Sequence, residues 1–254
     1  RGGKRSGSLA LVLDQIGFRV TLVEGGYKAF RAAVLEDIPR LASRFDWRVI
    51  CGTTGSGKTR LLQALRAAGA QVLDLEALAN HRSSVLGAIP GVPQPTQKHF
   101  DTRIWNELRQ LDPTRPVFVE SESKKVGNVA VPTSLINAMR VGTCLNLVLP
   151  DMERVALLME DYDFFVCDHE AFCERLGALT PIRGKAVVEN WQSQVRAGQI
   201  EPVVQALLTL HYDPVYVASM ERNFQHYGAS KLIAPYARSM QAMHQLASEI
   251  LNSA

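Results

Sequence analysis

The fold of this chain is decided by one glycine-rich stretch, Gly52-Thr53-Thr54-Gly55-Ser56-Gly57-Lys58-Thr59. It matches G-x-x-x-x-G-K-[ST], the pattern of a phosphate-binding P-loop, at every fixed position. Glycines let backbone N–H groups converge on phosphate oxygens, and a helix opening near Lys58 points its positive end at them. Lys58 adds a mobile charge, and the Thr59 hydroxyl is placed to bind Mg²⁺. The predicted phosphate-binding residues are Gly52, Thr53, Gly55, Ser56, Gly57, Lys58 and Thr59.

The residues around the P-loop predict a sheet covered by helices. A short apolar run at 48–51 leads directly into the loop, and leucines at helical spacing follow it. Further apolar runs at 71–73, 116–119 and 144–149 have the length and composition of strands. Strands that alternate with helices indicate a parallel sheet, so we predict an α/β fold.

The two ends of the chain give weaker patterns. Residues 9–16 predict a short helix, 19–23 alternate as a strand does, and 27–45 predict a second helix. From Met152 onward the pattern is almost entirely helical. We therefore predict four parts, namely an N-terminal remnant of a small α/β unit at 1–30, a linker helix at 31–47, a P-loop α/β domain at 48–165 and a helical C-terminal region at 166–254.

Acidic side chains follow two of the predicted strands at the points where the strands end. Asp74 and Glu76 come after the second strand, and Glu120 and Glu122 come after the third. Open α/β sheets bind ligands at the carboxyl ends of their strands, so we expect these acids beside the P-loop. Lys58, Glu120 and Asp74 are the predicted catalytic residues, and Thr59 with Glu120 is the predicted Mg²⁺ site. Helix capping is the alternative for Asp74.

A series of blocks gives the chain a specific resemblance. Arg1-Gly2-Gly3-x-Arg5-Ser6 resembles the tail of the C-x-R-G-G-x-R-S loop of the rhodanese domain in tRNA 2-selenouridine synthases. Later blocks resemble the same family in the same order: Asp74-Leu75-Glu76, Ala79-Asn80-His81-Arg82, Gln94-Pro95-Thr96-Gln97, Glu120-Ser121-Glu122-Ser123 and His211-Tyr212-Asp213-Pro214. The resemblance covers essentially the whole chain and implies that 1–30 is the C-terminal remnant of a rhodanese domain.

The resemblance also implies a chemistry. Members of this family convert 2-thiouridine at the tRNA wobble position to 2-selenouridine through S-geranyl-2-thiouridine, using geranyl diphosphate and selenophosphate. The implied partner is the anticodon region of tRNA, and the substrate or tRNA candidates are Glu76, His81, Arg82, Gln94, Gln97, Glu122, Lys124 and Tyr212. The family's rhodanese cysteine would lie two positions before Arg1 and is not in this sequence. We therefore expect a fragment that geranylates but does not complete selenation.

Composition sets broad limits on the class of protein. The chain has 254 residues, of which 46% are hydrophobic and 21% charged, values that are ordinary for a globular protein. No apolar run approaches the roughly 20 residues of a membrane helix. The four cysteines are scattered without a C-x-x-C pair. We expect a cytoplasmic protein without a disulfide framework, and the net charge of +3 permits an anionic partner without requiring one.

Two other functions remain open from the residues alone. A P-loop kinase or NTPase would use ATP, with Glu120 or Asp74 as base, and a non-catalytic RNA-binding fragment would need neither. The sequence does not decide whether ATP is used, nor the oligomeric state. A geranyl chain requires an apolar groove, for which Phe100, Trp105, Phe164 and Phe165 are available, although aromatic residues are more often part of the core.

Overall fold

A parallel sheet of five strands lies at the centre of the protein. In the computed structural model, which describes residues 4–82, 84 and 86–253, these strands are ordered β2-β3-β1-β6-β7. Their bounds are Gln71–Leu73 (β2), Val117–Glu120 (β3), Trp47–Cys51 (β1), Thr143–Leu147 (β6) and Lys231–Ile233 (β7). Every pair of neighbours is parallel, as the alternation of strands and helices predicted.

Alternation of side chains along the strands builds two separate cores. In β1, Val49 and Cys51 are buried in one apolar cluster, whereas Ile50 between them is buried in another. In β3, Val117 and Val119 join the first cluster and Phe118 joins the second. Successive side chains of a strand point to opposite faces, so strands that are apolar at every position need cover on both faces.

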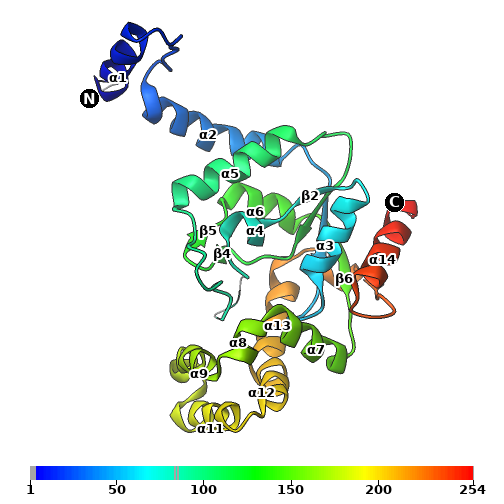
Figure 1. Ribbon diagram of the computed structural model, residues 1–254. Coiled ribbons are helices and arrows are strands. Elements are labelled where there is room, and N and C mark those ends of the chain that lie inside the picture. The colour runs from blue at the N-terminus through cyan, green and yellow to red at the C-terminus, as the bar shows by residue number, and fades with distance from the viewer. Residues whose placement is uncertain (1–3, 83, 85, 254) are drawn as a thin grey trace.

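Helices supply that cover (Figure 1). On one face, α3 (Lys58–Ala67) packs beside α14 (Met240–Asn252), and both contribute to the cluster around Ile50. On the other face lie α5 (Gln97–Gln110) and α6 (Thr133–Arg140), with α2 (Gly26–Ala42) against them. The short helix α4 (Leu75–Ala79) follows β2, and a hairpin of β4 (Lys125–Val126) and β5 (Val129–Ala130) follows β3.

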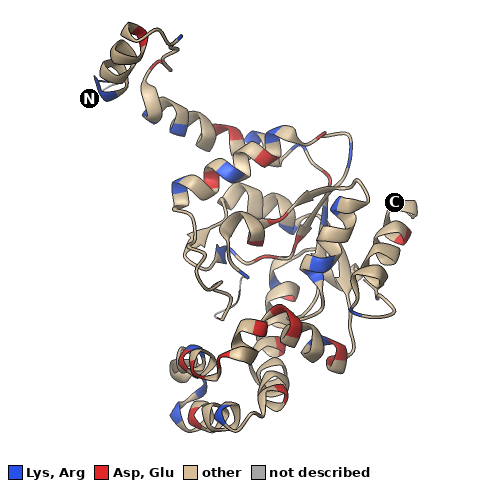
Figure 2. Ribbon diagram, viewed as in Figure 1, with Lys and Arg blue, Asp and Glu red and all other residues tan. Residues whose placement is uncertain are grey.

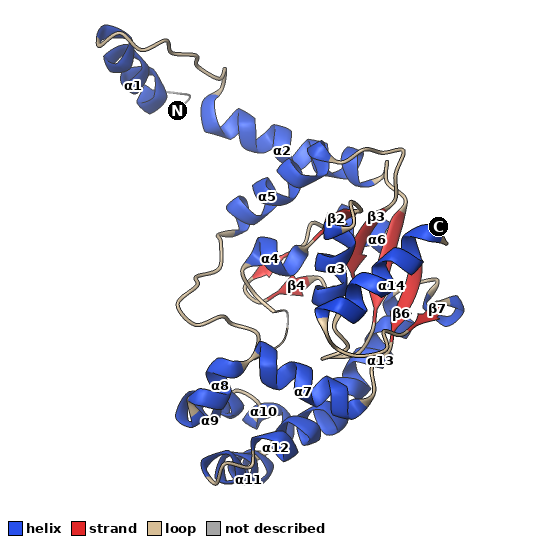
Figure 3. Cartoon of the chain, turned by 45° about the vertical axis from the view of Figure 1, so that its right-hand side comes forward, coloured by secondary structure: helices blue, strands red, loops and turns tan. Residues whose placement is uncertain are grey.

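A helical lobe is inserted between β6 and β7. Its helices are α7 (Asp151–Asp161), α8 (Asp163–Cys167), α9 (His169–Gly177), α10 (Thr180–Arg183), α11 (Lys185–Arg196) and α12 (Ile200–Leu207), followed by a π-helical turn at Leu208–Tyr212 and α13 (Asp213–Asn223). The lobe has its own core, which includes Phe172, Leu176 and Trp191. In Figures 1 and 3 it extends from the end of the sheet that carries the P-loop helix α3.

The strands around the P-loop confirm the predicted α/β fold, but one prediction near the N-terminus is wrong. The region after residue 165 is almost entirely helical, as predicted, although it also takes part in the sheet domain, since β7 pairs with β6 and α14 covers the sheet. Residues 19–23 form a loop instead of a strand, with Leu22 and Val23 more than half exposed. Within the described residues no neighbouring strand pairs with this segment, so its alternating pattern lacks the partner that would favour an extended strand over a solvated loop.

The N-terminal part leads away from the sheet. Helix α1 (Lys4–Gln15) buries only Ala10 and stands beyond α2 in Figure 3. Helix α2 begins at Gly26 and therefore crosses the predicted boundary at residue 30. Arg1–Gly3 lie outside the described residues, and a rhodanese origin of 1–30 stays a prediction. Among the described helices, none combines the length and apolarity needed to cross a bilayer.

Two P-loop glycines are required by close contacts. Gly57 has φ of 90°, and a Cβ there would lie 2.6 Å from the Met243 Cε of α14. A Cβ on Gly52 would lie 2.6 Å from the Leu147 carbonyl oxygen. The loop is thus wedged between its own strand, β6 and α14, which fixes its path.

Replacing Gly52 by alanine should destabilise the fold more than replacing Gly69 does. Both glycines have positive φ, but a Cβ on Gly69 meets nothing within 4 Å, whereas a Cβ on Gly52 would lie 2.6 Å from the backbone carbonyl oxygen of Leu147. Gly69→Ala should therefore cost only about 1 kcal/mol in backbone strain, whereas Gly52→Ala should cost about 2–4 kcal/mol because backbone must also move. Urea denaturation of both variants measures the difference. Equal losses would show that β6 does not constrain the loop.

Candidate functional site

The P-loop lysine is buried and held by its own loop. Lys58 Nζ donates to the carbonyl oxygens of Gly52 at 2.8 Å and Thr53 at 3.1 Å. It also lies 4.8 Å from the centre of the Tyr216 ring, which α13 places over the loop. These contacts hold the ammonium group at the mouth of the loop without a carboxylate partner within salt-bridge distance among the described residues. The lysine charge therefore remains available for an anion.

A cavity of about 530 Å³ opens over this lysine. Its floor includes Gly55, Gly57, Lys58 and Thr59 of the P-loop, and its other walls come from the ends of β2 and β3 and from α7 and α13. This is the carboxyl edge of the parallel sheet, where ligands bind in open α/β folds. The volume is within the range of small-molecule sites.

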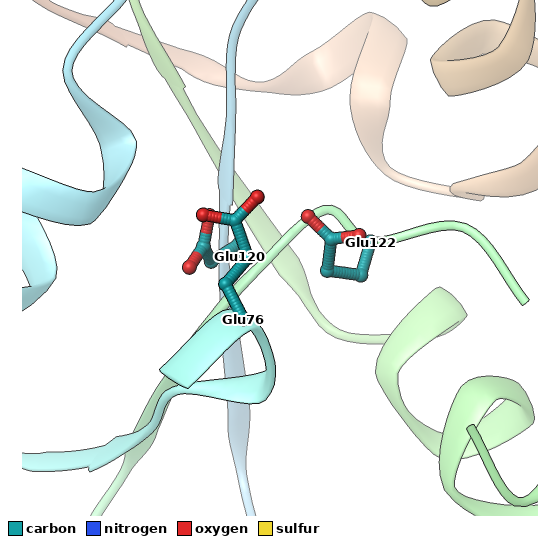
Figure 4. Close-up of side chains that lie close together, drawn as sticks. All are labelled: Glu76, Glu120 and Glu122. Atoms are coloured by element: carbon teal, nitrogen blue, oxygen red, sulfur yellow. The ribbon is translucent and has the colours of Figure 1, made fainter. Parts of the chain in front are cut away.

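Three glutamates converge on this cavity from two strand ends. Parallel pairing sets Glu120 opposite Ile50, two residues before the P-loop, and Glu122 follows it. Glu76 comes from the first turn of α4, and its Oε2 accepts a 3.2 Å hydrogen bond from the Thr59 hydroxyl. One carboxylate oxygen from each glutamate lies within 4.8 Å of the others (Figure 4). Glu120 and Glu122 are almost wholly buried.

Crowding of these acids changes their protonation. Burial, followed by the charge of Glu122, raises the pKa of Glu76 to about 8, although Lys58 opposes the shift. Burial and the neighbouring Glu76 raise the pKa of Glu120 well above its ordinary value. Like charges in a desolvated site disfavour the ionised form, so the cluster holds protons at neutral pH unless a cation compensates it.

The cluster fits the predicted Mg²⁺. Glu120 Oε1 is buried without a hydrogen-bond partner in the described part of the chain, which leaves a desolvated acceptor directed into the site. Carboxylate oxygens are the protein ligands that Mg²⁺ prefers. The hydroxyl of Thr59 in the P-loop donates a hydrogen bond to Glu76 and so lies beside these carboxylates. Glu76 and Glu122 extend the predicted ligand set of Thr59 and Glu120.

Asp74 lies at the same edge of the sheet, where its side chain caps a helix. Its Oδ1 accepts a 2.8 Å hydrogen bond from the backbone N–H of Ala77 and so caps α4. The capping alternative is therefore confirmed, and its charge still raises the pKa of both Glu76 and Glu120. A catalytic role for Asp74 stays a prediction.

One arginine that the sequence did not single out ties the P-loop to the helical lobe. Arg154 of α7 is buried and donates to the Thr54 carbonyl oxygen at 2.8 Å. It also forms a two-point pair with Asp213, at 2.6 and 3.0 Å. The only sequence signal was its place in the buried stripe that includes Val155. Asp213 of the His-Tyr-Asp-Pro block thus positions the loop through Arg154.

Comparisons with known proteins point to a single family. The family described as the tRNA 2-selenouridine synthase AAA domain matches residues 45–183. A tRNA 2-selenouridine synthase of Nitrosomonas eutropha is 30% identical over 266 residues, covering 87% of this chain and 68% of the relative. The one of Shewanella sediminis is 30% identical over 276 residues, covering 96% of this chain and 71% of the relative.

The chain belongs to the tRNA 2-selenouridine synthase family. The synthase of Nitrosomonas europaea is 38% identical over 165 residues, covering 64% of this chain but only 42% of the relative. The matches thus span between 42% and 71% of the length of these curated relatives. No solved structure matches the chain.

Of the remaining family-block residues, two glutamines hold the β4–β5 hairpin. Gln94 donates to the carbonyl oxygens of Ala79 and Val126 and accepts from the Asn128 N–H. Gln97 both donates to and accepts from the backbone of Ala130 at 2.8 Å. In each glutamine these contacts occupy both the amide nitrogen and the amide oxygen, so both side chains have a structural role in holding the hairpin. Their contact with tRNA stays a prediction.

Three of the remaining substrate or tRNA candidates lie in two different pockets. Arg82 and Tyr212 line the P-loop cavity, where the Arg82 guanidinium lies 4.7 Å from the Tyr162 ring centre. His81 lies instead in a second pocket that includes Gln94 and Arg175. Burial, followed by Arg175, lowers the pKa of His81, so this imidazole is neutral.

Charge does not single out a face for tRNA. Lys124 is exposed directly before the β4–β5 hairpin, two positions after Glu122. Figure 2 shows lysine and arginine interspersed with aspartate and glutamate over the sheet region and over α9 and α11.

Replacing Arg154 by methionine should destabilise the protein by about 2 kcal/mol. The change keeps an apolar side chain but leaves the Asp213 carboxylate and the Thr54 carbonyl without their donor. The matched control is Arg196→Met, which removes an exposed pair with Glu170 and should produce no measurable change. Chemical denaturation compares the two. Equal effects would contradict a bridging role for Arg154.

Without divalent cations, the protein should lose stability as pH rises. The folded state raises the pKa of Glu76 from 4.5 to about 8, so it binds more protons than the unfolded state between these values. The stabilisation that comes from this bound proton is fully present below about pH 4.5 and is lost as pH rises through about 8. The melting temperature should therefore fall between about pH 5.5 and 8.5. Glu76→Gln should flatten that slope, and an unchanged slope in the variant would contradict the assignment.

Proposed function

We propose that this chain takes part in modifying the tRNA wobble uridine, converting 2-thiouridine to 2-selenouridine through S-geranyl-2-thiouridine. Geranyl diphosphate and selenophosphate are the proposed co-substrates. Membership of the family supports tRNA selenouridine modification. The observation that carries the finer proposal is a P-loop lysine beside a buried carboxylate cluster, since this pair suits a departing diphosphate and its counter-cation.

In the first step, the thiouridine sulfur attacks C1 of the geranyl group. The C1–O bond breaks, its electron pair leaves with the diphosphate, and N3 of the uridine loses its proton as the S–C bond forms. The P-loop N–H groups and Lys58 stabilise the negative charge that gathers on the leaving oxygen. Glu120 and Asp74 are the candidates for accepting the proton.

A Mg²⁺ ion would be held by Glu76, Glu120 and Glu122 with Thr59 beside them, and it would neutralise diphosphate charge. Without such a cation the three glutamates would repel an anion lying in the P-loop. Selenophosphate is another small phosphate anion, so the same cradle suits the second step, in which selenium takes the place of the S-geranyl group at C2.

For tRNA, Arg82 and Tyr212 are the residues best placed. Both line the cavity, and anticodon readers stack unpaired bases on aromatic and guanidinium faces. Lys124 is exposed and available for a phosphate of the backbone. The wobble base would enter the cavity from the side of the helical lobe.

The test incubates this chain with Mg²⁺, geranyl diphosphate and a 2-thiouridine anticodon stem-loop, followed by mass spectrometry of the RNA. The RNA should gain one geranyl group. Lys58→Ala should slow the gain by at least about a hundredfold because it removes a preorganised charge from the leaving group. The control, Lys231→Ala, alters an exposed lysine of β7 and should leave the rate unchanged.

The same samples separate the alternatives. ATP turnover without any geranyl gain would contradict the proposal and favour a P-loop kinase or NTPase. RNA binding with neither reaction, while a full-length relative is active, would favour a binding fragment.

A further inference from the structure

A second, apolar cavity adjoins the P-loop cavity inside the helical lobe. Nearly all of its lining is hydrocarbon from α7, α8, α9 and α12, including Met159, Phe165, Val166, Phe172 and Val204. The two cavities share four lining residues, namely Thr54, Ser84, Leu158 and Tyr212. Thr54 belongs to the P-loop itself, so the apolar cavity opens directly beside the phosphate cradle.

The walls of this cavity are built from aromatic rings in contact. Phe165 stacks on Phe172 with ring centres 5.3 Å apart, and Tyr162 lies parallel to Phe165 at 6.1 Å. Phe165 and Phe172 belong to the core of the lobe. Of the aromatic residues that the sequence offered for a geranyl groove, Phe165 lines this cavity, whereas Phe100 is fully buried in the sheet core.

The size and polarity of the cavity limit what it can hold. Its volume is about 60 Å³, which corresponds to about four to six water molecules. Waters need two to four polar partners each, and this lining offers few. In the liquid each of these water molecules takes up about 30 Å³, and an apolar group of roughly five carbon atoms fills a comparable total space.

We propose that this cavity receives the distal isoprene unit of a ten-carbon isoprenoid diphosphate. The diphosphate lies in the P-loop, the proximal unit passes Thr54 and Leu158, and the distal unit fills the cavity. This assignment rests on the proposed function for the phosphate head. It adds the place of the chain in the fold: a five-carbon ligand lacks the second unit that fills the cavity, and a fifteen-carbon ligand has one unit more than the cavity holds.

Calorimetric titration with Mg²⁺ present tests the assignment on the unmodified chain. The probes are pyrophosphate and the five-, ten- and fifteen-carbon isoprenoid diphosphates. The ten-carbon ligand should bind at least tenfold more tightly than the five-carbon ligand, because its distal unit leaves water. The fifteen-carbon ligand should bind no more tightly than the ten-carbon one. Equal affinity for pyrophosphate and the ten-carbon ligand would overturn the proposal.

Two variants on α12 test whether the isoprenoid chain of the ligand lies in this cavity. Val204→Phe fills the cavity and should lower the affinity for the ten-carbon ligand to that of the five-carbon one, with pyrophosphate binding unchanged. Gln205→Phe adds the same ring at the next position, outside the lining, and should change neither affinity. Unchanged binding of the ten-carbon ligand to a folded Val204→Phe protein would overturn the proposal, and the chain-length series decides the matter if that variant does not fold.

These results separate the two proposals. The predicted order of affinities without geranyl transfer to RNA would leave the cavity assignment standing and reject the proposed function. Geranyl transfer with no dependence of affinity on chain length would reject the cavity assignment and leave the proposed function standing.

Discussion

Mutual repulsion among three glutamates, two of them buried, determines the charge of the cavity over the P-loop. Glu76, Glu120 and Glu122 bring an oxygen each within 4.8 Å of one another, beside the single ammonium group of Lys58. Each ionised carboxylate in so small a volume makes the next one harder to ionise, which is why their pKa values rise. The parallel pairing of β1 with β3 enforces this arrangement, because it holds Glu120 level with the strand that enters the P-loop. The sheet thus supplies the stability that the cluster lacks.

The helical lobe divides the site into a polar and an apolar part. Arg154 of α7 donates to the Thr54 carbonyl oxygen of the P-loop and pairs with Asp213 of α13, so a hydrogen bond from an arginine held within the lobe fixes the lobe to the loop. Behind that contact, α7 and α12 enclose a cavity with almost no polar lining. A ligand with a charged head and an apolar tail satisfies both parts at once, whereas a nucleotide would leave the apolar part unused. This difference favours the isoprenoid diphosphate over ATP.

The sequence alone predicted the structural features that depend on residues close together in the chain. The P-loop, β1 and β2 follow from a local motif and from short apolar runs, and the acids at strand ends follow from the geometry of parallel sheets. Strand β7 has only three residues, two of them exposed, so no pattern marks it. The alternation at 19–23 failed for the opposite reason, since strand propensity expresses fit to a neighbouring strand and none is described there.

Contacts between distant elements could not be predicted in this way. The sequence placed Glu120 at the site, but Glu122 and Glu76 joined the predicted metal ligands only once α4 and β3 were set side by side. Arg154 reaches Thr54 and Asp213 across 100 and 59 positions of the chain. Gln94 and Gln97 drew attention as family-block residues, yet both bind the hairpin backbone. A block pattern identifies residues without separating those that hold a loop from those that meet a substrate.

The charges lining the main cavity imply an order of binding. Three cations line it, but Arg60 is paired with Asp161 at 2.6 Å and Arg82 donates to the Asp161 carbonyl oxygen and lies against Tyr162. Lys58 alone opposes the three glutamates, which hold protons at neutral pH when no cation is present. A diphosphate entering first would meet little positive charge besides Lys58, whereas a divalent cation entering first would displace the bound protons and add positive charge to the cavity. The cation should therefore bind before the anion, and the affinity for diphosphate should follow the occupancy of the carboxylate cluster.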